Sequence, residues 1–387
     1  MITKIVNGKI ILGERVLENY ALYFEDEKIM GIFNPSAPAA PVADTVIDAN
    51  GKYVSPGFVD IHTHGAGGSD FLDCEVEGYL TAAKMHAEHG TTALCPTTTS
   101  GEYRELLDTF SVYRKAKEIN DCGADLLGLH LEGPYFAMSQ KGAQDAKYVR
   151  DFDKEEYTNI LKVADGDIIR WSAAPELPGA VEFAKTLTSQ GILPSIGHSD
   201  ADNFAVEPAF EAGFTHVTHL YSCTSTITRD HGFRRLGVIE SAYLLDDIYV
   251  EIICDGKHLP PELIRLIYKI KGADRIALIT DSLALAGTDQ KHGFMQDTEF
   301  IIEDGVCKLM DRSAFAGSIA TADMLVRVAV KEAGISIVDA IKMITQPPAE
   351  IIGLAQKGML ERGVDADIVF FDDDINIYKL FVQGNVI

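Results

Sequence analysis

Residues 54–64 read VSPGFVDIHTH, an apolar run that ends in two histidines. Because side chains at positions i and i+2 of a strand lie on the same face, His62 and His64 would project together from its carboxyl end. Stretches such as YLTAAKMHAEHG (79–90) and PELIRLIYKIKG (261–272) have an amphipathic helical pattern. Helical stretches of this kind lie between short apolar segments, of which the run above is the first. The seven that follow it are TTALCPT (91–97), ADLLGLHLEG (124–133), IIRWSAAPE (168–176), ILPSIGHS (192–199), HVTHLY (216–221), YVEIICDG (249–256) and RIALITDS (275–282).

This alternation of strands and helices predicts a parallel α/β protein. Eight strands with crossover helices over about 300 residues favour a closed (β/α)₈ barrel of the TIM type. A doubly wound open sheet is the alternative. No G-x-G-x-x-G motif follows the first strand, which weakens the dinucleotide-binding form of that fold.

The two ends of the chain share a sequence pattern that differs from that of the middle. Short β-rich runs broken by Gly, Asn and Asp turns fill residues 1–54 and return in residues 356–387. VNGKII (6–11) and VQGNVI (382–387) resemble each other as strand–turn–strand units. We therefore predict one small β-sandwich-like domain built from both termini, with the barrel at 55–355 inserted between them. Two unrelated β extensions are the alternative.

Composition excludes several classes of protein. The chain carries 58 acidic and 34 basic residues, a formal net charge of −24, so general nucleic-acid binding is not expected. An anionic substrate would need a local basic pocket. No stretch reaches the roughly 18 apolar residues of a membrane span, and the start of the chain lacks a signal-peptide layout. Six scattered cysteines without a C-x-x-C motif favour a reducing, cytoplasmic location.

Polar residues end six of the eight expected strands. In a barrel the carboxyl ends of all strands meet at one mouth, where active sites lie. Several histidines and carboxylates that converge there are the donors of a Zn²⁺-type divalent site. The residues are His62, His64, His130, Glu132, His198, His219, Asp255 and Asp281. His216 also lies on the sixth strand, but it is three residues before His219 and faces a different way, so we expect it to be structural. Taken singly, each has a simpler interpretation, such as a hydrogen-bonded loop histidine or, for Asp281, a helix N-cap.

The motifs around these residues resemble those of a known family. PGFVDIHTHG (56–65) is similar to the entry motif of the amidohydrolase superfamily. Further along the chain, six motifs in order resemble the N-acetylglucosamine-6-phosphate deacetylase family: HLEGP (130–134), GHS (197–199), THLY (218–221), DGKH (255–258), TDS (280–282) and AGS (316–318). The fourth strand, IIRWSAAPE, has no lysine that could become a carbamate ligand, and the resemblance gives that carboxylate role to Glu132.

The resemblance implies a role for each matching residue. Glu132, His198 and His219 would hold a principal divalent metal, and His62 and His64 a second one. Asp281 would be the catalytic carboxylate, His258 would contact the substrate near its amide, and Gly133 would allow close approach of a ligand. Zinc is the metal we expect, one or two per subunit, although iron, manganese and cobalt accept the same donors. The resemblance also implies a homodimer.

Two segments depart from the family pattern in the region that binds substrate. The family reads THLYNAM or THLFNAM, whereas this chain has Ser222 and Cys223 in place of the Asn-Ala pair that helps hold a phosphate. Gln144 replaces the histidine of the frequent KGAH sequence. The segment TRDHGFRRLG (228–237) contains three arginines, and Arg229 best matches the family arginine that reaches the phosphate of a neighbouring subunit. Surface ion pairs are the alternative role of these arginines.

These observations lead to one expected function and three alternatives. We expect metal-dependent hydrolysis of N-acetylglucosamine 6-phosphate to glucosamine 6-phosphate and acetate, with Asp281 passing a proton from water to the leaving amine. The changes at Ser222 and Cys223 leave open another N-acyl amino-sugar phosphate, such as N-acetylgalactosamine 6-phosphate. A non-catalytic sugar-phosphate binding protein and a cyclic-amide hydrolase or deaminase on the same barrel are the remaining alternatives.

Overall fold

Eight parallel strands form a barrel in the computed structural model, which describes residues 1–387. In spatial order they are β8 (Phe58–Thr63), β11 (Thr91–Thr98), β13 (Leu129–Glu132), β14 (Ile168–Ala173), β15 (Leu193–Ile196), β16 (His216–Val217), β19 (Tyr249–Ile253) and β20 (Ile276–Ile279). β12 (Asp125–Leu126) pairs with β11 just before β13 does. Backbone hydrogen bonds from Asp281 to His62 and from His64 to Ser282, each 2.9 Å long, join the last strand to the first. The predicted (β/α)₈ barrel is therefore confirmed.

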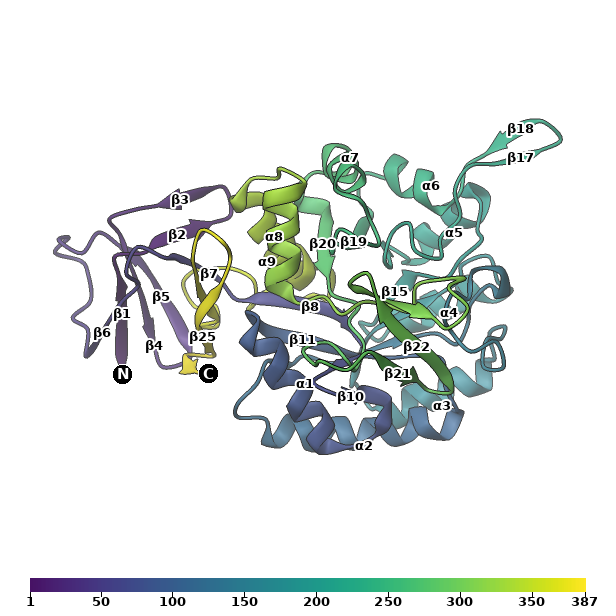
Figure 1. Ribbon diagram of the computed structural model, residues 1–387, viewed down its shortest axis with the longest axis horizontal. Helices are drawn as coiled ribbons and strands as arrows, with labels where there is room; N and C mark the ends of the chain where they lie inside the picture. The colour runs from purple at the N-terminus through teal and green to yellow at the C-terminus, as the bar shows by residue number, and fades with distance from the viewer.

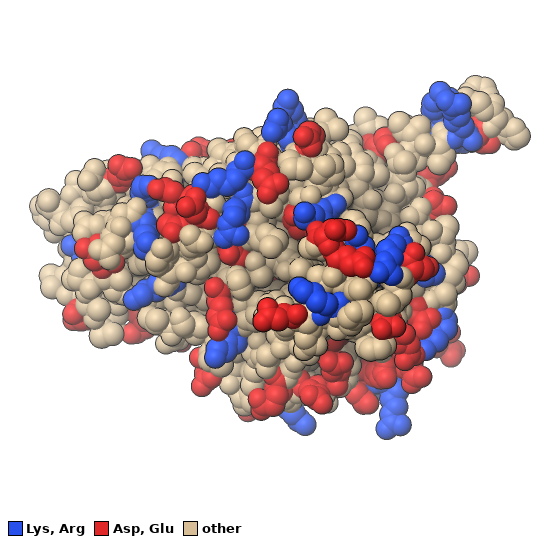
Figure 2. Space-filling model, in the orientation of Figure 1, with Lys and Arg blue, Asp and Glu red and all other residues tan.

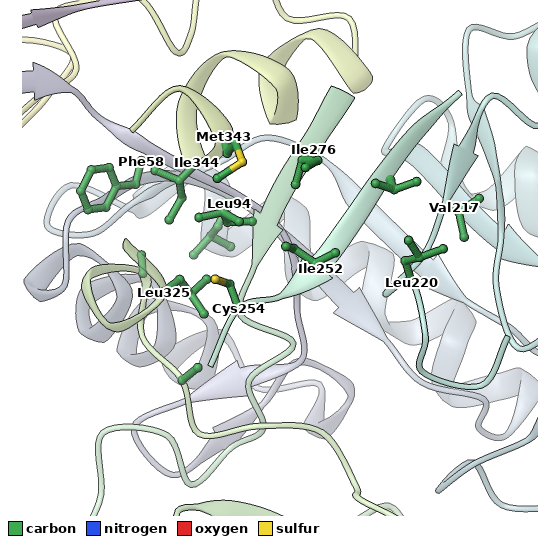
Figure 3. Packing of buried hydrophobic residues seen from close by; sticks show 14 of the residues in the cluster. Phe58, Leu94, Val217, Leu220, Ile252, Cys254, Ile276, Leu325, Met343 and Ile344 are labelled. Carbon is green, nitrogen blue, oxygen red and sulfur yellow. The ribbon is translucent and has the colours of Figure 1, made fainter. Parts of the chain in front are cut away.

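Helices cover the outside of the barrel (Figure 1). They are α1 (Val76–Glu88), α2 (Tyr103–Ile119), α3 (Lys154–Ala164), α4 (Ala180–Thr188), α5 (Asn203–Ala212), α6 (Val238–Leu244), α7 (Pro261–Lys271), α8 (Ala322–Arg327) and α9 (Ile337–Ile351). Their apolar faces bury one continuous core against the strands. Figure 3 shows Met343 and Ile344 of α9 packed beside Phe58, Leu94 and Ile276 of three barrel strands.

Strands from both ends of the chain form two further sheets beside the barrel (Figure 1). One sheet has the order β5 (Lys28–Phe33), β4 (Ala21–Glu25), β1 (Ile2–Val6), β6 (Thr45–Asp48). The other has the order β26 (Asn385–Val386), β25 (Ile377–Val382), β24 (Ile368–Phe371), β7 (Tyr53–Pro56), β2 (Lys9–Leu12), β3 (Arg15–Leu17). Residues of both sheets share a separate apolar core. The small β domain from both termini is thus confirmed as part of the fold. We propose its limits as 1–54 and 356–387, which leave out only the last two residues of β7.

Two β elements extend beyond the barrel and its helices. A three-stranded sheet, β21 (His292–Met295), β22 (Thr298–Glu303) and β23 (Val306–Leu309), follows the eighth barrel strand. A hairpin of β17 (Thr228–Asp230) and β18 (Phe233–Arg235) projects far from the body of the molecule (Figure 1). Figure 2 shows basic side chains gathered on this hairpin, while acidic side chains are spread over the lower face of the barrel in the same view. None of the helices combines the length and the apolar character needed to cross a membrane.

Candidate active site

The mouth of the barrel brings together the side chains that the strand ends predicted. His62 and His64 come from β8 and the residue after it, and Glu132 ends β13. His198, His219 and Asp281 follow β15, β16 and β20. Two groups of donor atoms, each within 4.8 Å of one another, share one carboxylate: His62, His64 and Glu132 in the first, and Glu132, His198 and His219 in the second. All of these residues are buried.

The backbone helps to aim three of these side chains. His198, His219 and Asp281 have φ values of 46°, 27° and 47°, in the left-handed region that few non-glycine residues adopt. Such conformations persist only where the surrounding structure holds them, and they cluster at functional sites. The chain therefore turns sharply at the ends of three barrel strands, each time at a residue of the predicted site.

Backbone carbonyls fix the ring orientation of the second histidine pair. Nδ1 of His198 lies 2.9 Å from the carbonyl oxygen of Gln140, and Nδ1 of His219 lies 3.1 Å from that of Ser222. A carbonyl can only accept, so each Nδ1 carries the proton. Each Nε2 faces Oε1 of Glu132, at 3.3 Å and 2.9 Å. A neutral imidazole in this tautomer presents its Nε2 lone pair to a cation.

The first histidine pair also points its ring nitrogens at carboxylates. Nε2 of His62 is buried without a hydrogen-bond partner and lies 3.4 Å from both Glu132 Oε1 and Asp281 Oδ1. Nε2 of His64 lies 3.2 Å from Asp281 Oδ1 and 3.5 Å from Glu132 Oε2. A buried donor atom with no partner, aimed at ionised oxygens among other nitrogen ligands, fits a divalent metal of the zinc type.

The charges at the mouth favour a cation. Burial by itself would lower the pKa of His62, but the carboxylates of Glu251, Asp281 and Glu132 raise it to about 10. Burial opposes ionisation of Glu132 and Asp281 as well, yet the neighbouring histidines hold the pKa of each below its usual range. Both carboxylates stay ionised at neutral pH, and a metal ion could replace the histidine protons that balance them.

A cavity of about 290 Å³ opens beside these residues. Among its lining are Gln144, Ser222, Cys223 and His258 from the predicted set, together with Tyr221, Met295 and Phe315. Nδ1 of His258 lies 2.8 Å from Oδ2 of Asp255, which fixes its ring. The lining contains no lysine or arginine. Arg229 does not reach this cavity in its own chain, because it lies on the exposed hairpin.

Two predicted residues have contacts other than those expected. The amide of Gln144 donates to Oε2 of Glu132 at 2.8 Å and accepts from the backbone N–H of Ser100 at 2.8 Å, so it orients a predicted metal ligand. Gly133 has a φ of 96°, and an added Cβ would lie 2.4 Å from Oγ of Ser100 and 2.7 Å from the ring of Phe136. Close packing by these protein atoms therefore already requires glycine there.

Sequence reasoning missed a buried ion pair beside the histidines. Arg170 of β14 and Glu251 of β19 are fully buried, with 2.7 Å between Nη1 and Oε2. Nδ1 of His62 lies 2.7 Å from Oε1 of Glu251. The signal was present in the sequence, because each residue is a charged side chain in the middle of an apolar strand segment, where an unpaired charge is very costly.

Comparison with known proteins agrees with this geometry. The amidohydrolase family matches residues 53–387 of the chain. The N-acetylglucosamine-6-phosphate deacetylase of Bacillus subtilis (strain 168) is 29% identical over 97% of this chain and 95% of its own length. The crystal structure of N-acetylglucosamine-6-phosphate deacetylase from Pasteurella multocida has a TM-score of 0.93 and 30% identity, covering 100% of both chains.

A third relative has been solved with a ligand. An aspartate-to-alanine variant of the Mycobacterium smegmatis N-acetyl-D-glucosamine-6-phosphate deacetylase, in complex with N-acetyl-D-glucosamine-6-phosphate, has a TM-score of 0.90 and 26% identity. It covers 100% of this chain and 98% of its own. The family match spans the barrel, the histidine–carboxylate mouth and the strands after it, so this chain is an enzyme of the amidohydrolase family.

Proposed function

We propose that this enzyme hydrolyses the N-acetyl group of N-acetylglucosamine 6-phosphate with the help of a divalent metal, giving glucosamine 6-phosphate and acetate. The observation that carries the proposal is the pair of histidine groups that share Glu132, with ionised Asp281 beside them at the edge of a cavity. The names of the relatives described above support the choice of substrate.

The donor set suits a metal of the zinc type, and iron, manganese or cobalt would accept the same nitrogen and oxygen ligands. Glu132, His198 and His219 would hold the principal metal, and His62 and His64 a second one that also touches Glu132. When bound, such a metal would lower the pKa of a water molecule on it and polarise the amide carbonyl of the substrate.

The protein's own groups would move the protons and orient the substrate. Asp281 would take a proton from the attacking water and pass it to the amine nitrogen as the carbon–nitrogen bond breaks. Because it is ionised and 7% exposed, it can act as a base and still reach the cavity. His258 donates from Nδ1 to Asp255, which leaves Nε2 as the ring atom available to the amide of the substrate.

The phosphate would need charge from outside the cavity of one chain, because no lysine or arginine lines that cavity. Arg229 is exposed and has no carboxylate partner, whereas Arg235 on the same hairpin pairs with Asp230 at 3.0 Å. In a homodimer, the projecting hairpin would carry Arg229 to the phosphate in the neighbouring subunit. All six cysteines are free, which is consistent with a cytoplasmic location.

Acetate release by the purified, metal-analysed protein tests this function. The rates with N-acetylglucosamine 6-phosphate, its galacto epimer and unphosphorylated N-acetylglucosamine are compared. We expect the first to give by far the highest kcat/KM. Ser222 and Cys223, which line the cavity, favour the epimer as the second candidate, and a higher kcat/KM for it would change the substrate but keep the chemistry. No acetate from any of the three would overturn the hydrolase proposal in favour of a binding protein.

A further inference from the structure

The ion pair of Arg170 and Glu251 connects strands on several sides of the barrel. In addition to its ion pair with Glu251, the guanidinium of Arg170 donates to Oγ of Ser195 at 3.0 Å, to Oγ1 of Thr218 at 2.9 Å and to the carbonyl oxygen of Ile61 at 3.1 Å. These partners belong to β15, to the end of β16 and to β8. Each of the three guanidinium nitrogens of Arg170 therefore has a hydrogen-bond partner, which fixes the side chain beside the carboxylate of Glu251.

Glu251 uses its two oxygens for different partners. Oε2 faces Arg170, at 2.7 Å from Nη1. Oε1 accepts from Nδ1 of His62 at 2.7 Å and from the backbone N–H of His219 at 3.1 Å. One buried carboxylate oxygen thus contacts a ring from the first histidine group and the main chain of the second.

We propose that the Arg170–Glu251 pair is a positioning device for the second metal position, the one formed by His62 and His64. An ionised carboxylate can only accept, so Glu251 holds the proton of His62 on Nδ1 and leaves Nε2 free to bind a metal. Arg170 keeps the carboxylate in place and balances its buried charge. The inference rests on the metal site that belongs to the proposed function.

The effect would fall first on one of the two histidine groups, because Glu251 contacts the ring of His62 but only the backbone N–H of His219. His198 and His219 are oriented from Nδ1 by the carbonyls of Gln140 and Ser222, not by Glu251. His62 has no orienting partner at Nδ1 other than Glu251. A purely structural role of the ion pair would lower stability without a preference between the metal positions, whereas a positioning role weakens the position at His62 first.

The variant Glu251→Gln separates these roles. A carboxamide has one oxygen, and Arg170 and His62 each lie 2.7 Å from a different oxygen of Glu251, so glutamine places an amide N–H₂ against one of the two. Zinc content is measured after dialysis, and zinc affinity by competition with a chromogenic chelator. We expect two zinc ions per chain in the native protein. In Glu251→Gln, one site should keep its affinity and the other should weaken by about 10- to 100-fold.

Asp367→Asn is the matched control. Asp367 is also a buried carboxylate, which lies 2.9 Å from Nζ of Lys357 and accepts from the backbone N–H of Gln383 at 2.8 Å, away from the histidines. This variant should lose thermal stability and keep both zinc sites. Equal zinc affinities in native protein and Glu251→Gln, or equal weakening of both sites, would overturn the positioning role. Native protein that holds one zinc and still releases acetate would overturn the positioning role and leave the proposed hydrolysis standing.

A measurement on the native chain covers the case in which Glu251→Gln does not fold. In zinc-loaded protein labelled with ¹⁵N-histidine, long-range ¹H–¹⁵N spectra report which ring nitrogen carries the proton. We expect a slowly exchanging proton on Nδ1 of His62, assigned by its absence in His62→Asn. A proton on Nε2 of His62 would contradict the proposal.

Discussion

Asp281 combines an unusual backbone conformation with the proposed role of catalytic carboxylate. Its φ of 47° lies in a region where Asp is enriched among non-glycine residues. Its N–H donates to the carbonyl of His62 at 2.9 Å, and its Oδ1 lies 3.2 Å from Nε2 of His64. The residue therefore closes the ring of strands with its main chain and faces the histidines with its side chain.

Asp281→Asn tests this role. Asn tolerates the same backbone conformation, so the fold and most of the bound metal should be retained. The amide cannot take up a proton, and we expect kcat for acetate release to fall by about 10²- to 10⁴-fold. The measurement is kcat together with metal content of the same preparation. Turnover close to that of the native enzyme would contradict the assignment.

The sequence predicted which donors meet at the mouth but not how they are held. His62, His64, Glu132, His198 and Asp281 could be identified because each lies at or just after the end of an apolar strand, and strand ends converge in a barrel. The charge of Glu251 within an apolar strand was visible in the sequence, but its partners and those of Gln144 were not, because they depend on which side chains face each other across the barrel. Such contacts leave no spacing pattern in one sequence.

The projecting hairpin of β17 and β18 leads to a prediction about phosphate binding. If Arg229 binds the phosphate in a neighbouring subunit, Arg229→Ala should raise KM for the phosphorylated sugar by roughly 10- to 100-fold, the cost of a charge-assisted hydrogen bond. It should change kcat little and leave the unphosphorylated sugar unaffected. Steady-state kinetics on both sugars tests this.

Arg104→Ala is the control for Arg229→Ala, because Arg104 is a 90% exposed arginine of α2 that pairs only with Asp108 on its own helix. It should leave both KM values unchanged. The interpretation of the hairpin fails if Arg229→Ala and Arg104→Ala have the same kinetics.

Helix α1 presents a buried histidine to the first barrel strand. Nε2 of His86 lies 2.9 Å from Oγ1 of Thr63, and burial lowers the pKa of His86 to about 4. The folded state thus disfavours the proton relative to the unfolded chain, whose histidine titrates near 6.5. The stability from neutral His86 is fully present above about pH 6.5 and is lost as the pH falls toward 4.

His86→Gln removes this titration while keeping an acceptor for Thr63. Between pH 7 and pH 4, the native protein should lose on the order of 3 kcal/mol more unfolding free energy than the variant. Urea denaturation at both pH values measures the difference. His231→Gln, at a 95% exposed histidine of the hairpin turn, should follow the native protein. Parallel pH profiles of native protein and His86→Gln would exclude this role.

The elements that the sequence predicted are those whose burial leaves a pattern. The barrel strands are apolar runs because both of their faces are covered. The strands β21 to β23 pair only with one another and are in part exposed, so no continuous apolar run of the barrel type marks them. Their cavity residue Met295 was missed for the same reason.

One lysine joins the two parts of the whole molecule. Nζ of Lys357 lies 3.0 Å from Asp125 of β12, 3.0 Å from Asp365 and 2.9 Å from Asp367, which precedes β24. Its side chain is 5% exposed. Burial by itself would lower the pKa of Lys357, but the carboxylates of Asp367 and Asp125 raise it, so the side chain stays a cation. This cation contacts three carboxylates where the small β domain meets the barrel. The short β-rich runs at both ends of the chain predicted the small β domain. No pattern in the sequence predicted the contact of Lys357 with Asp125.

Lys357→Met would leave those carboxylates without a counter-charge. We expect a loss of about 3–5 kcal/mol in unfolding free energy, measured by urea denaturation. Lys154→Met is the comparison, because Lys154 pairs with Glu182 where both side chains are mostly exposed, at 68% and 59%. It should cost at most about 1 kcal/mol. Similar losses in the two variants would show that the junction does not depend on Lys357.

At the scale of the whole molecule, the dependence of acetate release on bound metal tests the proposed hydrolysis. The native chain is stripped with a chelator, analysed for metal, and assayed for acetate release from N-acetylglucosamine 6-phosphate before and after stepwise addition of zinc. We expect no acetate above background from the stripped protein, and activity that returns in proportion to zinc and levels off at one or two ions per chain. Undiminished turnover by the metal-free protein would contradict the role assigned to Glu132 and the four histidines.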